Sequence, residues 1–525
     1  MAELADAPAA TSDRHFYLTT AIDYINGSPH LGHAYEKIAA DTLVRYKRLQ
    51  GWDTWFVVGS DEHSLNILRR AESLGKDPRT FCDEMVALFK DVFRTLNIDY
   101  SIYARTSSEA NLRTAQEFVQ RCWDRGHVYA GVYHGWYCPS CNRFYKEEEL
   151  LPEHLCPEHQ RPVDQVDEPN YFFRLSAFQE RLLAHYEAHP EFVQPESRRN
   201  EMLSVIRGGL EDFSVSRSTV KWGVPLPFDA SQVIYVWFDA LLDYVSGVGF
   251  ADDPERWRRF WPADVHVIGK DITRFHAIYW PAMLWAAGEE LPRRIFAHGF
   301  INLGGQKLSK SAGLVVDPVE LANEFGADAV RYTLLREVPF DRDGDFSLDA
   351  FRNRYNADLA NDLGNLVNRA GTMIQRYRQG LLPELSAEEQ LDADLRLAGQ
   401  QVVAEIDPLL EALDFSNALV AIWGFITKAN RYLEQTSPWT LARDPAAGAR
   451  LDMVLRTTLE ACRLIAHLVL PCMPATAQRI SEQLGFALHT GPGWDAWGQL
   501  PPDTRVGKLS PLFPRIESTA EPAAG

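Results

Sequence analysis

Residues 15–42 decide the fold, and they read HFYLTTAIDYINGSPHLGHAYEKIAADT. A β-favouring apolar run at 15–22 is followed by a polar turn at 26–29, and then by apolar residues at helical spacing. Gly51 ends the expected helix, and a second apolar run begins directly after it at 55–58. Strand, glycine turn, helix and strand in this order are typical of a parallel, nucleotide-binding sheet. The sequence therefore predicts an α/β fold with a Rossmann-like parallel sheet.

The composition indicates a soluble globular protein of several domains. With 525 residues, the chain exceeds what one hydrophobic core usually organises. Its 46% hydrophobic and 24% charged residues fit neither a disordered nor a fibrous protein. No apolar run is long enough for a membrane span, and residues 1–14 lack a signal-peptide core, so we expect a cytoplasmic protein. The net charge of -19 excludes nucleic-acid binding through bulk positive charge and requires any such site to be a local basic surface.

Changes of pattern along the chain predict its domains. Clustered Cys, His, Pro and Glu interrupt the α/β pattern, and strand-like runs return at 233–238 and 266–269. After Asp345 we expect long amphipathic helices, over 350–378, 391–413 and 449–470. The predicted segments are an N-terminal tail (1–14), the first half of the sheet domain (15–116), an insertion (117–232), the second half (233–345), an all-α helical bundle (346–516) and a disordered tail (517–525).

Two short knuckles in the insertion carry metal-ligand residues. Cys138 and Cys141 form C-x2-C, and after a gap of fourteen residues Cys156 and His159 form C-x2-H. This spacing can bring four ligands to one tetrahedral point, as structural zinc requires. A redox C-x-x-C motif is the alternative, but it leaves Cys156 and His159 without a role. We therefore expect one structural Zn2+ ion.

Two motifs far apart in the chain suit a triphosphate. Residues 30–33, HLGH, begin the first expected helix, where backbone amides and the positive end of the helix dipole favour phosphate. Residues 307–311, KLSKS, follow a Gly-Gly pair, and their two lysines can neutralise charge as pyrophosphate leaves. Taken singly, each motif has a plainer explanation, namely structural histidines or a solvated basic loop.

Together and in this order, the motifs resemble the HIGH and KMSKS signature pair of class I aminoacyl-tRNA synthetases. Leu31 and Leu308 differ from the commonest letters by apolar substitutions, and neither side chain has to touch phosphate. This family activates an amino acid by attack of its carboxylate on the α-phosphate of ATP, so catalysis rests on positioning and charge stabilisation. The resemblance implies Mg2+ with ATP. It implies His30, His33, Lys307 and Lys310 as catalytic residues, and Gly32, Glu36, Lys270 and Asp271 beside them in the ATP site.

Further segments are similar to one member of this class, the methionyl-tRNA synthetases. Residues 59–63, GSDEH, close the second expected strand, and Asp61 matches the carboxylate that holds the substrate ammonium. Residues 235–241, YVWFDAL, end another expected strand, and Trp237 matches the aromatic wall of a pocket that suits a polarizable thioether. Ser64 stands where this family commonly has glycine. The resemblance implies L-methionine as substrate and a pocket of Ile22, Tyr24, Asp61, Trp237, Ala240, Leu241, Tyr244 and His276.

The expected helical bundle carries candidate RNA-reading side chains. Asn365 and Arg369 lie one turn apart, and Trp439 follows Pro438. Amide, guanidinium and indole groups read and stack on unpaired bases, although a solvated face and core packing are the plainer explanations. By position these segments match the family's anticodon-recognising helices, which implies tRNA(Met) as the partner. The insertion also resembles the single-zinc form of one subtype, and the missing extra C-terminal domain leads us to expect a monomer.

Three rival functions stay open at this point. Another class I synthetase would carry a larger editing insertion or a zinc ion in the amino acid pocket. A noncatalytic tRNA-binding relative would have no use for both phosphate motifs. A nucleotidyltransferase of the same fold without a tRNA partner leaves the helical domain unexplained.

Overall fold

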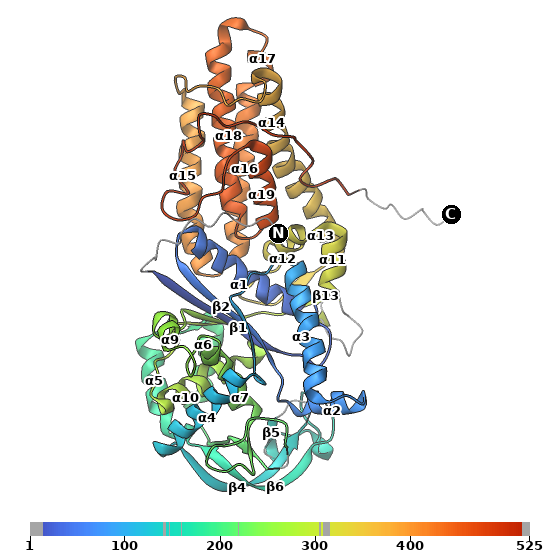
Figure 1. Ribbon diagram of the computed structural model, residues 1–525, viewed down its shortest axis with the longest axis vertical. Coiled ribbons are helices and arrows are strands. Elements are labelled where there is room, and N and C mark those ends of the chain that lie inside the picture. Colours follow the sequence, from blue (N-terminus) through green and yellow to red (C-terminus); the bar gives the residue numbers. More distant parts are fainter. Residues whose placement is uncertain are drawn as a thin grey trace, which may run out of the picture.

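The computed structural model describes most of the chain. The described residues are 14–139, 143–145, 147–158, 160–218, 220–303, 306–307 and 316–516. The molecule is elongated, with a helical bundle at one end and a mixed α/β body at the other (Figure 1). Within the described ranges, no helix has both the length and the apolar character needed to cross a membrane.

A six-stranded parallel sheet forms the centre of the α/β body and confirms the predicted fold class. The strands lie in the order β3-β2-β1-β11-β12-β7, and every neighbouring pair is parallel. The chain runs outward from β1 to β3 and returns to β11 on the other side of β1, which creates the crevice where such sheets bind ligands. The strands are β1 His15–Tyr24, β2 Asp53–Asp61, β3 Ile102–Arg105, β7 Val193–Gln194, β11 Val265–Gly269 and β12 Ile295–His298.

Helix α1 (Leu31–Leu49) links β1 to β2 and is buried on almost every side. It contacts both strands and also α12 (Ala327–Glu337), so it lies between the sheet and this helix. Asp41 of α1 and Arg331 of α12 form an ion pair at 2.6 Å, and neither side chain is exposed. Arg331 also donates to the carbonyl oxygens of Pro471 and Cys472. One satisfied guanidinium therefore connects α1 to the bundle.

The predicted insertion forms a small antiparallel sheet at the end of the molecule opposite the bundle (Figure 1). Its order is β5-β4-β6-β8, with β4 Val128–Cys138, β5 Arg143–Tyr145, β6 Asp164–Phe173 and β8 Phe213–Ser214. The expected boundary at 116/117 falls inside α4 (Glu109–Asp124). Strand β7 lies within 117–232 but pairs with β12. This segment therefore also completes the edge of the main sheet.

One expected strand is a helix, which corrects the prediction for 233–238. Only Val233–Ile234 is extended, as β10, and it pairs with β9 (Ser216–Arg217) outside the main sheet. Helix α7 (Val236–Leu241) follows at once and carries Trp237. A short, fully apolar run has no periodicity that separates a buried strand from a buried helix. The strand expected at 266–269 is confirmed as part of β11.

The remaining helices of the α/β body surround these sheets. They are α2 Leu65–Ser73, α3 Pro78–Thr95, α5 Gln179–Ala188, α6 Glu196–Arg207, α8 Asp243–Ser246, α9 Pro254–Phe260 and α10 Trp280–Ala287. Short 3-10 turns are η1 Glu147–Glu149, η2 Pro152–His154, η3 Leu175–Phe178 and η4 Lys270–Ile272, and a π-helical turn is η5 Phe275–Tyr279.

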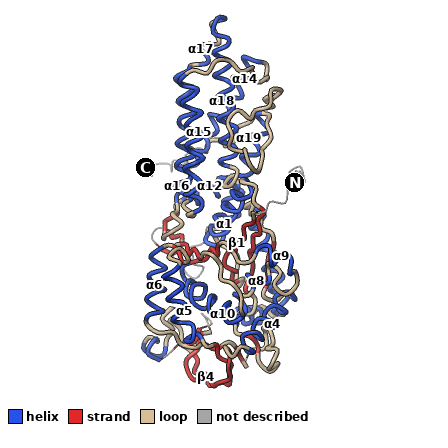
Figure 2. Tube along the Cα trace, turned by 90° about the vertical axis from the view of Figure 1, so that its left-hand side faces the viewer, coloured by secondary structure: helices blue, strands red, loops and turns tan. Residues whose placement is uncertain are grey.

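A linking region leads into a bundle of long helices, and of these two parts the sequence predicted the bundle. The linking region holds β13 Ile301–Leu303, β14 Gln306–Lys307, β15 Gly344–Phe346, α11 Pro318–Phe325 and α12 Ala327–Glu337. The bundle holds α13 Leu348–Arg354, the π-helical η7 Tyr355–Gly364, α14 Asn365–Arg378, α15 Gln390–Glu411, α16 Phe415–Thr436, α17 Pro438–Leu441, η8 Pro445–Ala447, α18 Gly448–Val469 and α19 Pro474–Leu484. The long helices run along the long axis, and α17 lies toward the tip (Figure 2).

Candidate active site

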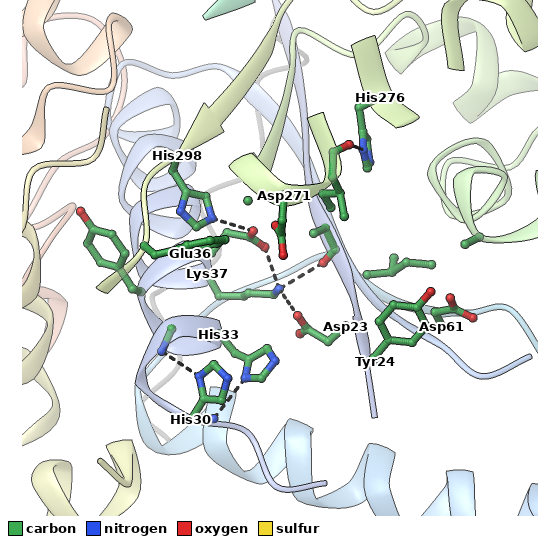
Figure 3. Close-up of a pocket in the computed structure, with 18 of the residues that line it drawn as sticks. Asp23, Tyr24, His30, His33, Glu36, Lys37, Asp61, Asp271, His276 and His298 are labelled. Carbon is green, nitrogen blue, oxygen red and sulfur yellow. Dashed lines mark hydrogen bonds and ion pairs between the residues drawn. The ribbon is translucent and has the colours of Figure 1, made fainter. Parts of the chain in front are cut away.

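A cleft of about 260 Å³ opens where β1, β2, β11 and β12 end. It lies at the crevice beside β1 and at the amino end of α1, as expected for ligand binding by a doubly wound sheet. Figure 3 shows side chains from these elements converging on it. Predicted residues that line the cleft are Ile22, Tyr24, His30, Gly32, His33, Glu36, Asp61, Trp237, Ala240, Leu241, Tyr244, Asp271 and His276.

His30 and His33 cap the start of α1 reciprocally. The Gly32 N–H donates to His30 Nδ1 at 3.1 Å, and the His30 N–H donates to His33 Nδ1 at 3.1 Å. A backbone N–H can only donate, so both Nδ1 atoms accept and each neutral ring carries its proton on Nε2. A Cβ at position 32 would lie 2.9 Å from His30 Cε1, which explains the glycine. The helix amino end therefore combines backbone amides with two imidazole N–H donors, a set that suits phosphate oxygens.

A buried charge network lies beside these histidines and was not predicted. Lys37 Nζ contacts Asp23 Oδ1 and Glu36 Oε1, each at 2.7 Å, and donates to the Ala21 carbonyl at 3.1 Å. Burial would lower the pKa of Lys37, but Asp23 and Glu36 raise it above its ordinary value. The lysine is therefore charged and its three protons have acceptors.

Glu36 extends this network to the next strand. Its Oε2 lies 2.9 Å from Nε2 of His298, which ends β12. Burial would raise the pKa of Glu36, but Lys37 and then His298 hold it below the ordinary value. The carboxylate is thus ionised and fixed between two partners. Glu36 lines the cleft as predicted, but its oxygens already have protein partners.

Asp61 is a buried carboxylate in a different state. It ends β2 beside Tyr24 at the cleft wall (Figure 3). Burial raises its pKa to about 8, and the nearby Asp239 carboxylate contributes to the rise. Among the described side chains it forms no ion pair within 4 Å. A cationic group in the cleft would stabilise its ionised form.

Aromatic rings close the neighbouring part of the cleft. Trp237 of α7 stacks on Phe275 with centroids 3.7 Å apart and planes 6° apart, and Tyr24 meets the Trp237 ring edge-on at 6.1 Å. Phe275 and His276 belong to the π-helical turn η5, a feature that often marks functional sites. The rings form an apolar wall that adjoins Asp61 at Tyr24 (Figure 3), and this arrangement fits a substrate with an ammonium and an apolar chain.

His276 is held as a neutral hydrogen-bonding group. Its Nδ1 lies 3.0 Å from the Ile272 carbonyl, which can only accept, so Nδ1 carries the proton. Its Nε2 then accepts from the Tyr244 hydroxyl at 2.7 Å. Burial lowers the pKa of His276 to about 4, so both side chains stay neutral and fixed at physiological pH.

The lysines of the predicted ATP site are not brought together in the described part. Lys270 forms an ion pair with Asp343 at 2.7 Å and does not line the cleft. Lys307 ends β14, but its side chain lies outside the described atoms, and Lys310 lies outside the described residues. The carboxyl end of β12 and the residues that follow it line the cleft instead, with His298, Gly299 and Phe300.

Two of the four predicted zinc ligands can be placed. Cys138 ends β4, and Cys156 follows η2. Both are fully buried in one small cluster with Tyr145 and Val163. Cys141 and His159 lie outside the described residues, and the described ones contain no group of three or more potential metal ligands. The buried cysteine pair is compatible with the predicted donor set.

Helix α17, which carries the predicted anticodon residue Trp439, lies toward the tip of the bundle, away from the α/β body (Figure 1). The Arg369 guanidinium lies 5.5 Å from the centre of the Trp439 ring and pairs with Glu434 at 2.6 Å. Asn365 begins α14 and is exposed. Arg369 and Trp439 therefore form one cluster, with Asn365 one helical turn away.

Several cleft residues were not predicted from the sequence, although some of them have a feature that could have indicated them. Lys37 and Asp23 sit in segments that are otherwise buried, and a charged residue on a buried face is a candidate for a functional site. His298 ends a parallel strand, where ligands of such sheets bind. The remaining missed lining residues are Ala21, Tyr35, Gly269, Ile272, Gly299, Phe300 and Ile301.

Comparisons with known proteins agree along nearly the whole chain. A family model for "tRNA synthetases class I (M)" matches residues 16–169 and 160–371, and one for "Anticodon binding domain of methionyl tRNA ligase" matches residues 382–519. The methionine–tRNA ligase of Caldanaerobacter subterraneus is 46% identical over 97% of this chain and 80% of its own. That of Streptomyces coelicolor is 43% identical over 97% of this chain and 98% of its own.

Solved structures give the same result. The Mycobacterium tuberculosis methionyl-tRNA synthetase in complex with methionyl-adenylate matches with a TM-score of 0.92 and 42% identity, over 96% of this chain and all of that one. Its free form matches with a TM-score of 0.86 and 40% identity, over 96% of this chain and 98% of that one. This chain belongs to the methionyl-tRNA synthetases, the methionine–tRNA ligases of class I.

Proposed function

We propose that this methionine–tRNA ligase forms methionyl-adenylate in the cleft beside β1. The observation that supports this best is the convergence of two unlike surfaces on one cavity. The amino end of α1, with His30 and His33, suits phosphate, while Asp61 and the wall at Trp237 suit an ammonium with an apolar chain. An aminoacyl-adenylate joins these chemical features in one molecule.

The first step needs no side-chain nucleophile. A methionine carboxylate oxygen attacks the α-phosphorus of ATP, and the bond from that phosphorus to the bridging oxygen breaks as pyrophosphate leaves. Asp61 holds the ammonium, Trp237 and Tyr24 hold the thioether chain, and the two histidines donate to phosphate oxygens. Lys307 and Lys310 neutralise charge on the leaving pyrophosphate, and Mg2+ accompanies ATP.

In the second step, a hydroxyl of the tRNA 3′-terminal ribose attacks the methionyl carbonyl and AMP leaves. Asn365, Arg369 and Trp439 contact the anticodon of tRNA(Met) at the other end of the molecule. Helix α17, which carries Trp439, lies far along the long axis from β1 (Figure 1), and this supports the proposal because an L-shaped tRNA presents its anticodon far from its acceptor end.

We also propose that the enzyme is monomeric and cytoplasmic. Size-exclusion chromatography with light scattering would test the first part, and cell fractionation would test the second.

Amino-acid-dependent exchange of pyrophosphate into ATP tests the adenylation step without tRNA. We expect strong exchange with methionine among the twenty amino acids, and weak exchange with norleucine and homocysteine, because one methylene is worth only about 1–3 kcal/mol. A larger exchange with a different amino acid would contradict the assignment of Asp61 and Trp237. No exchange with any amino acid would contradict the proposed role of the cleft.

We propose further that Cys138, Cys141, Cys156 and His159 hold one structural zinc ion. Burial of the two described cysteines in one cluster supports this. Metal analysis should give one zinc per chain, and Cys138→Ser should lose it. Removal of zinc should increase hydrogen exchange in residues 125–165 and leave the bundle unchanged, because a structural zinc contributes directly to folding. Full protection without metal would contradict the proposal.

A further inference from the structure

A second cavity, of about 720 Å³, lies where the α/β body meets the helical bundle. We call it the junction cavity. Helix α6, strand β12, helix α12 and the turn between α15 and α16 all contribute to its wall. Its principal lining residues are Arg199, Phe296, Arg336, Phe340, Arg354 and Ser416. It shares no lining residue with the cleft beside β1.

Two arginines in this cavity have unmet hydrogen-bond donors. Arg199 donates from Nη2 to the Tyr186 carbonyl at 2.9 Å, and Arg336 reaches Ser416 Oγ from Nη1 at 3.5 Å, the outer limit for a hydrogen bond. In each side chain Nε is buried, and no described residue accepts a hydrogen bond from it. Within the described residues, neither guanidinium forms an ion pair with a carboxylate. A buried, unpaired donor of this kind is costly, and more so on a charged group.

The carboxylates of the cavity do not meet this demand, since most already have partners. Glu337 pairs with Arg354 at 2.6 Å, and Asp341 pairs with Arg342 at 3.0 Å. Asp414 caps α16 by accepting from Asn417 N at 3.3 Å and Nδ2 at 2.7 Å. The fourth carboxylate, Glu196, is exposed on the first turn of α6. The cavity therefore offers two cationic groups whose Nε donors have no acceptor among the described residues.

We propose that the junction cavity binds a small tetrahedral oxyanion of the phosphate class. A guanidinium presents its N–H groups as a planar fork that matches phosphate oxygens, and two such forks can hold one anion from two sides. Arg199 comes from α6 and Arg336 from α12, so the anion bridges two separate elements. The source is either free phosphate or a backbone phosphate of bound tRNA, which share this chemistry.

The position of the cavity gives such an anion a structural consequence. Phe296 and Phe340 stack at its wall, with centroids 5.4 Å apart and planes 13° apart. The Phe340 ring also stacks on His298, whose centroid lies 5.1 Å away and which lines the cleft beside β1. Asn417 and Ser416 belong to α16 of the bundle. The anion therefore contacts the bundle, with one ring between its cavity and the cleft.

Equilibrium dialysis of the full chain against inorganic phosphate, at constant ionic strength, tests this proposal. We expect Arg336→Gln and Arg199→Gln each to weaken phosphate binding by at least about tenfold, because each removes a charged fork. Arg342→Gln is the matched control and should bind as the wild type does, since its charge is taken by Asp341. His30→Ala controls for phosphate in the cleft and should also keep this binding.

Wild-type binding in both the Arg336→Gln and Arg199→Gln variants would overturn the proposal, as would its loss in His30→Ala. If the glutamine variants fail to fold by circular dichroism, Arg336→Lys replaces Arg336→Gln. It keeps the charge but loses the fork, and we expect about threefold weaker binding. Added tRNA(Met) identifies the source. Displacement of phosphate indicates a backbone phosphate, and unchanged binding indicates a free oxyanion.

Discussion

The cleft beside β1 and the junction cavity differ in which charged side chains have an ion-pair partner. In the cleft, the cation Lys37 is paired with two carboxylates, while Asp61 forms no ion pair with a described side chain. In the junction cavity, the carboxylate Glu337 is paired, while the cations Arg199 and Arg336 have no carboxylate partner among the described residues. Charges already paired hold the fold together, and a charge left without a partner predicts the sign of the ligand. The part of the cleft at Asp61 therefore suits an ammonium, and the junction cavity suits an anion.

The largest expected effect separates a paired cation from an unpaired one. Lys37→Met leaves the buried carboxylates of Asp23 and Glu36 without their shared cation, which typically costs about 3–5 kcal/mol. Arg336→Met removes a cation that neutralises no described carboxylate, so we expect a cost within about 1 kcal/mol. Urea unfolding followed by tryptophan fluorescence measures both. An equal loss of unfolding free energy in the two variants would contradict the proposed difference between the regions.

The next effect concerns the unpaired carboxylate of the cleft. Asp61→Asn removes the charge proposed to hold the substrate ammonium, at a cost of about 2–4 kcal/mol of binding. In pyrophosphate exchange, the KM for methionine should therefore rise roughly 30- to 1000-fold, and the KM for ATP should change little. The effect should be confined to methionine because the phosphate-binding groups lie at α1.

Asp243→Asn is a matched control for this change. Burial, and then Asp239, raise the pKa of Asp243 well above its ordinary value, which favours its neutral form. Asp243 does not line the cleft. We expect its KM for methionine to stay within about threefold of the wild type. Similar losses in both variants would indicate a general disturbance of this buried acidic region.

Much of the fold could be predicted because periodicity and turn residues report it locally. The run 15–42 predicted β1 and α1, and the amphipathic pattern predicted the long helices of the bundle. The run at 233–238 was predicted wrongly, because a fully apolar segment suits a buried helix and a buried strand equally. Strand β7 has two residues, too few to leave a pattern, and its place depends on pairing with β12.

Site residues that belong to a sequence motif could be predicted. Site residues whose role depends on partners far away in the sequence were predicted less well. His30 and Asp61 were found from family resemblance, and they do line one cleft. Lys37 was missed, since a lysine in a helix is usually exposed and its partner Asp23 belongs to another element. The Nε donors of Arg199 and Arg336 lack acceptors because of how the surrounding residues pack in three dimensions. No local pattern of the sequence contains that information.

The helical tip extends the comparison to a third region. The charge of Arg369 is already taken by Glu434, and its guanidinium lies over Trp439. Because its charge is paired, we predict that the arginine acts mainly by positioning the indole, and that the indole stacks on a base of the proposed anticodon contact. Trp439→Ala should therefore lower kcat/KM for tRNA charging by about 1–3 kcal/mol, and Trp439→Phe by less. Pyrophosphate exchange should be unchanged, and a larger loss in Arg369→Gln than in Trp439→Ala would reverse these roles.

The smallest effect is a pH dependence that only the cleft should show. Burial, and then Asp239, raise the pKa of Asp61 to about 8, so below pH 8 the free enzyme holds mostly the neutral acid. A bound ammonium requires the carboxylate, and methionine binding should therefore release close to one proton at pH 7 and weaken about tenfold per unit below pH 8. Calorimetric titration from pH 6 to 8, in buffers with different heats of ionisation, measures both. Asp61→Asn should abolish the proton release, because no other titrating group is proposed to face the ammonium. Release that persists in this variant would place the titrating group elsewhere.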